Sequence, residues 1–344
     1  MINNAFIGFG KSATRYHLPY VLTRKDKFNV RYIFDKTRNP QKETLAPYQG
    51  IQFTDSVETI LKDPQVTLVT ICTPPGSHFY YAKLCLEYGK NVLVEKPFTT
   101  TLEEAKILFA LAREKGLLVT PYQNRRFDSC FLTIKQAIES GKLGKIIEVE
   151  SHFDYFRPEV APQPGSAFEG AFYGLGVHTL DQMLALFGRP QQVFYHLRHL
   201  RQPDNPDDTY EAQLFYGDLK AIIKTSHLVK VPCPRFVVHG TKGSVVRYHI
   251  DQQEACLKNG IMPDHPDFAA DRQCALLEYI DDEGRSHTEH LPAVKGDYGR
   301  VYDAIYASLV HGATNYVSEQ EALTNLEILE RAFHQPSPSI ISLS

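Results

Sequence analysis

The stretch Ala5-Phe6-Ile7-Gly8-Phe9-Gly10-Lys11-Ser12-Ala13 decides the fold of this 344-residue chain. Its first three residues form an apolar, strand-like run, and the spacing Gly-x-Gly-x-x-Ala follows directly. In such a motif the first glycine permits a tight turn, the second lets the backbone approach a pyrophosphate, and the small third residue packs a helix on the strand. A helix is predicted next, over 13–24, which Pro19 can only kink or end early. We therefore interpret the motif as a dinucleotide-binding loop rather than an ordinary strand–helix turn, with predicted contacts from Gly8, Phe9, Gly10, Lys11, Ser12 and Ala13.

Strands and helices alternate through the first 122 residues. The predicted strands are 5–7, 29–34, 52–53, 66–72, 91–94 and 117–120. Capping boxes at Asp55/Glu58 and Thr101/Glu104 mark two of the helix starts between them. Alternation of this kind is typical of βαβ units and a parallel sheet. The sequence therefore predicts an α/β Rossmann dinucleotide-binding domain over residues 1–122.

The pattern changes after Tyr122. A helix over 131–139, a long strand over 145–156, a loop rich in proline and glycine and a helix over 177–187 come first. Strand-like runs then follow without helices between them, at 193–200, 210–216, 219–228, 236–239 and 244–249, and helices over 298–311 and 318–334 close the chain. Gly217-Asp218 joins two of these runs as a hairpin, which favours an antiparallel sheet with one face left to cover. Residues 123–344 are therefore predicted to form an α+β domain with a mostly antiparallel open sheet, used for substrate binding and oligomerisation.

Composition excludes several classes of function. The 37 basic and 40 acidic residues give a net charge of −3, so no basic excess calls for nucleic acid. The longest apolar runs are strand-sized, far short of the ~20 residues of a membrane span. The N-terminus goes straight into a strand without a signal peptide, and six cysteines never occur as Cys-x-x-Cys, so we expect reduced thiols and a cytoplasmic protein. No metal-ligand spacing is legible among the 14 histidines.

Asp35 follows the second predicted strand and bears on cofactor choice. An acidic residue there binds the adenine ribose hydroxyls of NAD and repels a 2′-phosphate. Lys36 and Arg38 come directly after it and are able to neutralise that phosphate. The pattern favours NAD slightly and leaves NADP open, and the less favoured alternative for Asp35 is a solvated turn residue.

Further candidates follow the later strands, whose carboxyl ends open onto the ligand crevice of a doubly wound sheet. By position the segment Thr73-Pro74-Pro75 with His78 is predicted to contact the nicotinamide ribose, although His78 can also simply start a helix. Glu95, Lys96 and Pro97 follow the next strand, and Asn124 follows the last. A lysine beside a bound dinucleotide indicates a dehydrogenase, and the alternative for Lys96 is a surface ion pair.

Taken together, these motifs resemble the Gfo/Idh/MocA family of NAD(P)-dependent oxidoreductases over essentially the whole chain. The resemblance rests on the glycine loop, on Cys72-Thr73-Pro74 with His78, and on Gly89-Lys-Asn-Val-Leu-Val-Glu95-Lys96-Pro97. Tyr122-Gln-Asn-Arg-Arg-Phe-Asp128 and Phe156-Arg157-Pro158 resemble more narrowly the branch that contains the NADP-dependent scyllo-inositol dehydrogenases. The family implies dehydrogenation of a sugar, cyclitol or related polyol, and a homodimer or homotetramer built through the C-terminal sheet.

The resemblance also implies catalytic roles. Lys96 matches the family lysine that touches the reacting hydroxyl, and an ammonium there stabilises the negative charge that develops on oxygen. His178 matches the family histidine, which can exchange the substrate proton, although it can also be structural. The family aspartate lies four residues before that histidine, where this chain has Gly174. Asp181 and Asp154 are possible substitutes that do not match the motif.

Four more residues are candidate substrate contacts. Arg125 and Arg126 follow the sixth strand and are suited either to clamp a substrate hydroxyl, carboxylate or phosphate or to join the domains by ion pairs. Tyr155 and Arg157 line the same entrance by family analogy.

These residues lead to one expected function and two alternatives. We expect hydride transfer between nicotinamide C4 and a secondary alcohol carbon of a sugar, inositol or related polyol, with Lys96 and His178 converging on that carbon. The alternatives are a non-catalytic dinucleotide sensor, for which Gly174 is the best argument, and a reductase of a non-sugar carbonyl.

Overall fold

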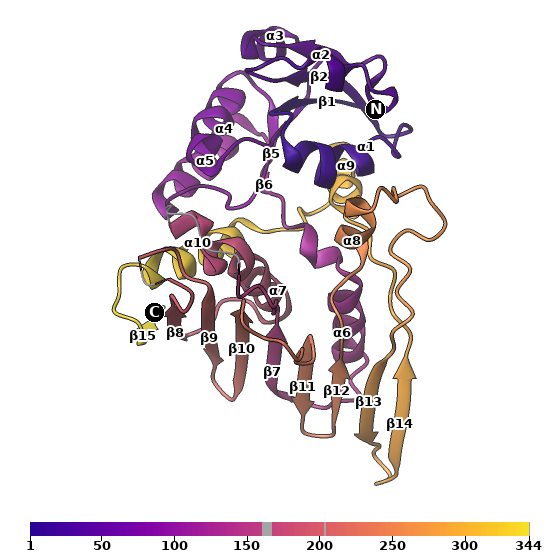
Figure 1. The fold of residues 1–344 in the computed structure, drawn as a ribbon, viewed down its shortest axis with the longest axis vertical. Helices are drawn as coiled ribbons and strands as arrows, with labels where there is room; N and C mark the ends of the chain where they lie inside the picture. Colours follow the sequence, from indigo (N-terminus) through magenta and orange to yellow (C-terminus); the bar gives the residue numbers. More distant parts are fainter. Residues whose placement is uncertain (160–166, 203, 344) are drawn as a thin grey trace. The chain divides into compact units, whose positions relative to one another are not determined.

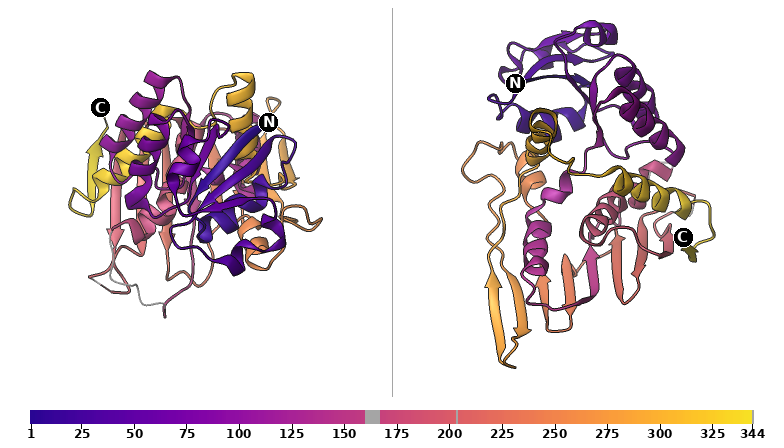
Figure 2. Two further views of the ribbon diagram at one scale, coloured as in Figure 1. Left: turned by 90° about the horizontal axis from the view of Figure 1, so that it is seen from above. Right: turned by 180° about the vertical axis from the view of Figure 1, so that it is seen from behind.

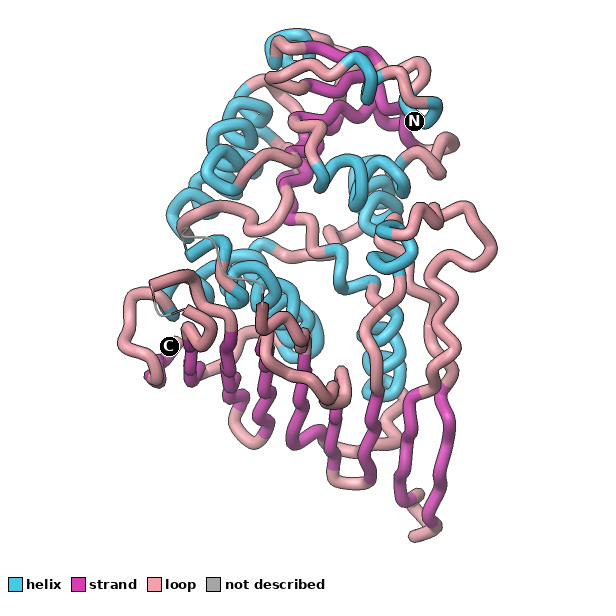
Figure 3. The backbone as a smooth tube through the Cα atoms, in the orientation of Figure 1, coloured by secondary structure: helices cyan, strands magenta, loops and turns pink. Residues whose placement is uncertain are grey.

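The structure of the protein is a computed structural model, and it describes residues 1–159, 167–202 and 204–343. The chain divides into two compact units. The first contains Met1–Asn124, Cys256–Phe268 and Tyr298–Leu323, and the second contains Arg125–Ala255, Ala269–Asp297 and Thr324–Ser344. The chain leaves the first unit close to the boundary predicted at 122/123. Two later segments, Cys256–Phe268 and Tyr298–Leu323, belong to the first unit, although the sequence prediction placed them in the second domain. The strands of the two units form two separate sheets (Figures 1 and 3).

The first unit is a Rossmann fold, as predicted. Its sheet has six strands among the described residues, in the order β3-β2-β1-β4-β5-β6. They are β1 (Ile2–Ile7), β2 (Phe28–Phe34), β3 (Gln52–Thr54), β4 (Leu68–Ile71), β5 (Asn91–Val94) and β6 (Val119–Pro121). Neighbouring strands pair in parallel throughout. Because β1 and β4 are central neighbours, the turn after each opens at the same edge of the sheet, where dinucleotides bind in this fold.

The helices of the first unit depart from the prediction in two places. They are η1 (Ala13–His17), α1 (Leu18–Val21), α2 (Pro40–Glu43), η2 (Ala46–Tyr48), α3 (Val57–Lys62), η3 (Pro75–Ser77), α4 (His78–Glu87), α5 (Leu102–Lys115) and α9 (Arg300–His311). The helix predicted over 13–24 starts as a π-helical turn and ends at Val21, with Pro19 in the first turn of α1. The capping box predicted at Asp55 is wrong, since Ser56 precedes α3 without a side-chain cap and Glu58 pairs with Lys62 at 2.6 Å. The box at Thr101 and Glu104 is confirmed.

The second unit is built on a nine-stranded, mostly antiparallel sheet, which confirms the predicted fold class for the residues described. The strand order is β14-β13-β12-β11-β7-β10-β9-β8-β15. The strands are β7 (Ile146–His152), β8 (Gln192–Arg198), β9 (Thr209–Tyr216), β10 (Leu219–Ser226), β11 (Phe236–Gly240), β12 (Gly243–Arg247), β13 (Ala275–Ile280), β14 (Ser286–Leu291) and β15 (Ser339–Ser342). One pair, β7 with β10, is parallel. The strand predicted over 145–156 ends at His152, and beyond it Phe156 keeps only an isolated bridge to Leu228.

The sequence missed the hairpin of β13 and β14 and the terminal strand β15. Residues 286–291, Ser-His-Thr-Glu-His-Leu, are too polar to predict a strand from their apolar pattern, and among the described strands β14 pairs with β13 alone. Edge strands of this kind gain stability from pairing rather than from burial, so hydrophobic periodicity does not reveal them.

Helices cover one face of the nine-stranded sheet, as the opposite views in Figures 1 and 2 show. The helical segments of this part of the chain are η4 (Asn124–Phe127), α6 (Ser129–Glu139), η5 (Ala167–Glu169), η6 (Phe172–Gly176), α7 (Val177–Phe187), α8 (Gln253–Lys258) and α10 (Glu319–Ala332). The proline- and glycine-rich loop predicted ahead of α7 includes 160–166, which lie outside the described residues. Within the described chain, no helix combines the length and the apolar character that crossing a membrane requires.

Alternation along the strands separates a buried face from an open one. On β7, Val149 and Ser151 are fully buried, whereas the side chains of Glu148, Glu150 and His152 are only partly covered. The buried face packs in one core with residues of α6, α7 and α10 such as Ile134, Met183 and Ile328. The other face therefore carries charged and polar side chains, and three of them matter below.

Candidate active site

The glycine loop after β1 has room for a phosphate group. Gly8 has a φ of +105°, and a Cβ at that position would lie 2.7 Å from the carbonyl oxygen of Cys72, so the backbone angle and the close approach both require glycine. At Gly10, no heavy atom of the described residues lies within 4 Å of the place a Cβ would take. The loop is therefore open where the motif brings the backbone to a pyrophosphate, and Ala13 is fully buried behind it.

Phe9 contributes backbone rather than side chain to this loop. Its ring is 2% exposed and packs against Tyr48 and Phe53, with centroid distances of 5.1 and 5.0 Å. Its carbonyl oxygen accepts a hydrogen bond from Lys42, whose ammonium lies 4.0 Å from the ring centroid. Lys42 thus places a positive charge at the loop. It was not predicted, because nothing in the glycine motif indicates position 42. Lys11 is exposed.

Some of the charged residues after β2 form hydrogen bonds or ion pairs with nearby residues. Asp35 is half-buried and accepts a hydrogen bond from the backbone N–H of Thr37 at 3.4 Å, while Lys36 is exposed. Arg38 donates from two nitrogens to the two carboxylate oxygens of Glu43, at 2.7 and 2.6 Å. The hydrogen bond from Arg38 is the largest cause that lowers the pKa of Glu43. Asp35 therefore keeps the character expected of a ribose ligand, whereas the Arg38 guanidinium is paired with a carboxylate.

Glu95 connects the end of β5 to the first helical turn. Its carboxylate accepts a hydrogen bond from the Ser12 hydroxyl, lies 3.0 Å from Nε2 of His17, and accepts the backbone N–H of Lys96 at 2.9 Å. Burial by itself raises the pKa of Glu95, but the hydrogen bond and charge of His17, the Ser12 hydroxyl and the charge of Lys96 together lower that pKa to about 2. Glu95 is therefore a buried, ionised carboxylate.

His17 completes this anchor and was not predicted. Its ring is fully buried, its Nδ1 lies 2.8 Å from the hydroxyl of Tyr302 on α9, and it packs against Tyr122 with a centroid distance of 3.8 Å. The family motifs gave no signal for it, because His17 is four residues beyond the glycine motif and its partners are far away in sequence.

His78 holds two strand-end turns together. It is 1% exposed at the start of α4, and its ring nitrogens lie 2.8 Å from the carbonyl oxygens of Pro97 and Thr73. Both nitrogens thus face backbone of the turns after β4 and β5, so His78 positions the segment that carries Lys96. Lys96 itself is half-buried directly after Glu95.

The remaining cofactor candidates of the first unit lie in turns. Pro74 precedes the short turn η3, Pro75 begins it, and the Ser77 hydroxyl donates to that of Thr73 at 2.8 Å. Asn124 is 7% exposed and begins η4 at the end of the unit.

In the second unit, His178 lies in the first turn of α7 and is 5% exposed. Gly174 lies one turn earlier, in the π-helical turn η6 that leads into α7. Apart from its chain neighbours and the backbone of its own helical segment, no heavy atom among the described residues lies within 4 Å of the position of a Cβ at Gly174. The family aspartate is therefore missing from a place that has room for its first side-chain atom.

The two substitutes considered for that aspartate have other partners. Asp181, on α7, accepts two hydrogen bonds from Arg126, from Nε at 2.8 Å and from Nη2 at 2.7 Å. Asp154 accepts the backbone N–H of Ser226 at 2.9 Å and lies 3.5 Å from His152. Both carboxylates therefore serve ion pairs or backbone contacts within their own unit.

Arg125 is likewise held by carboxylates. One of its nitrogens donates to Glu254 at 2.9 Å and another lies 3.4 Å from Asp128. Its guanidinium also lies 4.7 Å from the ring centroid of Phe153. These ion pairs lie within the second unit, and the two roles predicted for Arg125 and Arg126, clamping the substrate and joining the domains, stay predictions.

Tyr155 and Arg157 lie together, and their place at a substrate entrance stays a prediction. The Arg157 guanidinium is 4.0 Å from the ring centroid of Tyr155, and His227 packs edge-on against the same ring at 5.9 Å. Burial raises the pKa of the Tyr155 phenol, so it stays protonated near neutral pH. This pair offers a hydroxyl donor and a cation at one place.

Models of one oxidoreductase family match both parts of the chain. The model of its NAD-binding Rossmann fold matches residues 2–123, and the model of its C-terminal alpha/beta domain matches residues 135–339. The chain is 63% identical to the uncharacterized oxidoreductase YhhX of Escherichia coli, over 100% of this chain and 99% of that one. A crystal structure of a probable oxidoreductase yhhX agrees with a TM-score of 0.98 at 63% identity, over 100% of both chains. The scyllo-inositol 2-dehydrogenase (NADP(+)) IolW of Bacillus subtilis is 33% identical, over 96% of this chain and 92% of its own length.

Proposed function

This chain belongs to the Gfo/Idh/MocA family of NAD(P)-dependent oxidoreductases, and from that premise we propose that it oxidises a secondary alcohol of a sugar, an inositol or a related polyol, or reduces the matching ketone. The observation that carries the proposal is the fixed position of Lys96. It follows Glu95, an ionised carboxylate tied to Ser12 of the glycine loop and to His17. Lys96, a half-buried residue whose backbone N–H donates to Glu95 at 2.9 Å, thereby lies at the strand edge where this fold binds dinucleotides.

NAD(P), when bound, accepts or returns a hydride at C4 of its nicotinamide ring. Lys96 places a positive charge next to the substrate hydroxyl, and it stabilises the negative charge that develops on oxygen as hydride leaves carbon. His178 accepts the hydroxyl proton and releases it to water, which is the family role of a histidine at this position. Glu95 and His78 do not touch the substrate in this proposal, because their polar atoms are used to position the turns around Lys96.

Asp35 supports NAD as the preferred cofactor. Its carboxylate follows β2, where it is placed to bind ribose hydroxyls and to repel a 2′-phosphate. Arg38, the cation best suited to that phosphate, is paired with Glu43 on both carboxylate oxygens. The inositol dehydrogenase relative is named for NADP, so titration of both reduced cofactors is the direct test. An NADPH preference of about tenfold, or ~1.4 kcal/mol, contradicts the assignment.

A second candidate function is a non-catalytic dinucleotide sensor, which Gly174 favours. Position 174 is a glycine, whereas the family has there the aspartate that orients the histidine. The retention of both Lys96 and His178 argues against this candidate, since a sensor needs neither group. A reductase of a non-sugar carbonyl remains the third candidate, and it differs from the first only in the substrate.

The test is turnover of a panel of sugars and cyclitols, with non-sugar carbonyls as a second panel. Purified protein is assayed with both cofactors for the appearance or loss of reduced nicotinamide absorbance, and cofactor binding is measured in parallel. A Gly10→Val variant is the matched control, because its side chain occupies the open side of the loop and should abolish binding and turnover together. Cofactor binding without turnover on either panel overturns the enzyme and supports the sensor.

We propose further that the chain forms a homodimer or homotetramer through the open face of the nine-stranded sheet. Partly covered side chains such as Phe194, Phe215 and Val246 lie on that face, between charged neighbours. Sedimentation of the purified protein tests this, and a monomer at micromolar concentration contradicts it.

A further inference from the structure

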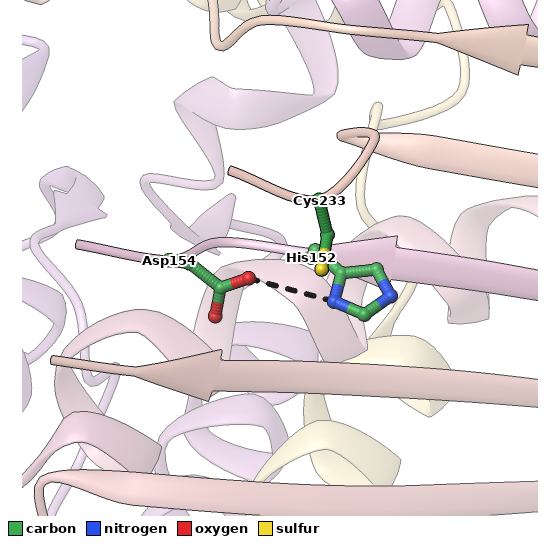
Figure 4. A group of neighbouring side chains, drawn as sticks. All are labelled: His152, Asp154 and Cys233. Carbon is green, nitrogen blue, oxygen red and sulfur yellow. Dashed lines mark ion pairs between the residues drawn. The ribbon is translucent and has the colours of Figure 1, made fainter. Parts of the chain in front are cut away.

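Three potential metal ligands meet on the open face of the second sheet. Nδ1 or Nε2 of His152, a carboxylate oxygen of Asp154 and Sγ of Cys233 all lie within 4.8 Å of one another. Figure 4 shows the three side chains together, with His152 and Asp154 coming from the end of β7 and Cys233 from the loop that precedes β11. The sequence shows no metal-ligand spacing here, because Cys233 is about 80 residues from His152 and Asp154 along the chain.

We propose that His152, Asp154 and Cys233 bind a divalent metal ion of the zinc class. A thiolate, an imidazole and a carboxylate are the ligand types that zinc takes in proteins, and three protein ligands leave a fourth position for water. Zinc bonds of about 2.0–2.3 Å in tetrahedral geometry place neighbouring ligand atoms about 3.3–3.7 Å apart. The distance of 3.5 Å between Nδ1 of His152 and Oδ2 of Asp154 meets that requirement.

Alternation along the end of β7 and the segment directly after it, where Phe153 and Tyr155 still donate to backbone carbonyls of Lys224 and Ser226, puts the first two ligands on one side. Side chains two residues apart in an extended strand point the same way, and the intervening Phe153 is buried on the other face, where it is 1% exposed. Asp154 is also oriented, because its Oδ1 accepts the backbone N–H of Ser226 at 2.9 Å. This contact leaves Oδ2 directed at the imidazole.

The third ligand stands on a stiff loop. Cys233 lies between Pro232 and Pro234, so the backbone on both sides has few conformations, and the residue before a proline is restricted to extended ones. The backbone N–H of His152 donates to the carbonyl of Arg235 at 3.0 Å, which holds the loop against β7. Cys233 is exposed in the single chain, so an ion can reach its thiol there. Little ordering is then needed to bring the thiolate to the imidazole.

Neighbouring charges favour a cation at this place. Nε2 of His152 lies 3.0 Å from Glu150, the arrangement in which a second carboxylate orients a metal-binding histidine. Lys224 is opposite His152 on β10, and its ammonium lies 3.4 Å from Glu211. With Cys233 ionised, the two carboxylates and the thiolate give three negative charges around one imidazole.

The decisive experiment uses cobalt(II) as the probe. Untagged, metal-stripped, reduced full-length protein is titrated with Co²⁺, and we expect about one equivalent to bind with a thiolate-to-cobalt charge-transfer band in the near ultraviolet. Cys233→Ser should abolish the band, and His152→Ala should weaken Co²⁺ and Zn²⁺ binding. Glu150→Gln should weaken both by about tenfold, as is usual for the partner of a metal-binding histidine.

Cys274→Ser is the matched control, because Cys274 is also an exposed thiol. It should leave the band and the affinity unchanged, and circular dichroism should be the same for all variants. No stoichiometric Co²⁺ binding, a band that survives Cys233→Ser, or a band that Cys274→Ser removes equally overturns the proposal. Turnover plays no part in these measurements, so their outcome is independent of the proposed dehydrogenase.

Discussion

Two buried carboxylates, Glu95 in the first unit and Asp181 in the second, are held in different ways. Glu95 is bound by a serine of the glycine loop, a histidine just beyond it and a backbone N–H. Asp181 is bound by the two nitrogens of Arg126, 55 residues away. In the parallel sheet the carboxyl ends of neighbouring strands share one edge, so their turns meet by topology. Antiparallel strands end at alternating edges, and the second unit relies on ion pairs between helical segments instead.

Replacement of Lys96 by alanine is expected to have the largest effect on activity, because it removes the residue that Glu95 positions. We expect kcat/KM for the best polyol to fall about 10³-fold, or ~4 kcal/mol, because the charge that stabilises the developing alkoxide is lost. Cofactor affinity should change little. Steady-state kinetics and cofactor titration measure the two, and Lys83→Ala is the control, since Lys83 pairs with Glu87 on the exposed side of α4 at 3.3 Å. Unchanged kcat/KM removes Lys96 from the chemistry.

Replacement of Arg126 by methionine tests how much the buried ion pair between Arg126 and Asp181 stabilises the second unit. It leaves Asp181, whose side chain is 2% exposed, without its bidentate partner, and breaking a buried pair in this way destabilises by about 3–5 kcal/mol. Hydrogen exchange of the α7 amides and urea unfolding measure the loss. The double variant Arg126→Met/Asp181→Leu should recover most of it, because no unpaired charge then remains buried.

The control for this variant is an exposed pair. Lys62→Met breaks the Glu58–Lys62 pair, whose side chains are 65% and 64% exposed, and should change stability by no more than about 0.5 kcal/mol. Equal effects of Arg126→Met and Lys62→Met show that the buried pair contributes no more than a surface one.

The same contrast explains how much of the molecule the sequence predicted. The glycine motif, the strand runs and Thr101/Glu104 are local signals, and they predicted the Rossmann fold of the first unit. His17, Lys42 and the partners of Arg126 act over long sequence distances, and no pattern in one sequence marks them. The two predicted capping boxes show the limit even of a local signal, because both have the same spacing. Glu58 forms an ion pair with Lys62, whereas the Glu104 side chain accepts a hydrogen bond from the backbone at the start of its helix.

Glu95→Gln tests the electrostatic anchor through pH. The pKa of Glu95 is lowered from 4.5 to about 2 in the folded protein, so the carboxylate adds stability above pH ~4.5, and that stability is lost as pH falls towards 2. A difference of this size corresponds to roughly 3 kcal/mol. Between pH 5 and pH 3 the wild type should therefore lose stability more steeply than Glu95→Gln, measured by urea unfolding. Parallel curves contradict the role assigned to His17 and Ser12.

Gly174→Asp has the smallest expected effect and bears on the second unit alone. A carboxylate one turn before His178 should orient the imidazole and favour its protonated form, which moves the acid limb of the pH–rate profile to higher pH. The limiting rate above that limb should rise about three- to tenfold, since the base is better positioned. Space at Gly174 makes the variant compatible with the fold, because a Cβ there meets no described heavy atom within 4 Å.

Gly174→Asn separates the two parts of this effect, because it has the shape of aspartate without the charge. It should raise the limiting rate in part and leave the acid limb in place. If Gly174→Asp moves neither the limb nor the rate, His178 is not the base that titrates in turnover. His178 would then be structural, and Lys96 would remain as the catalytic residue of the first unit.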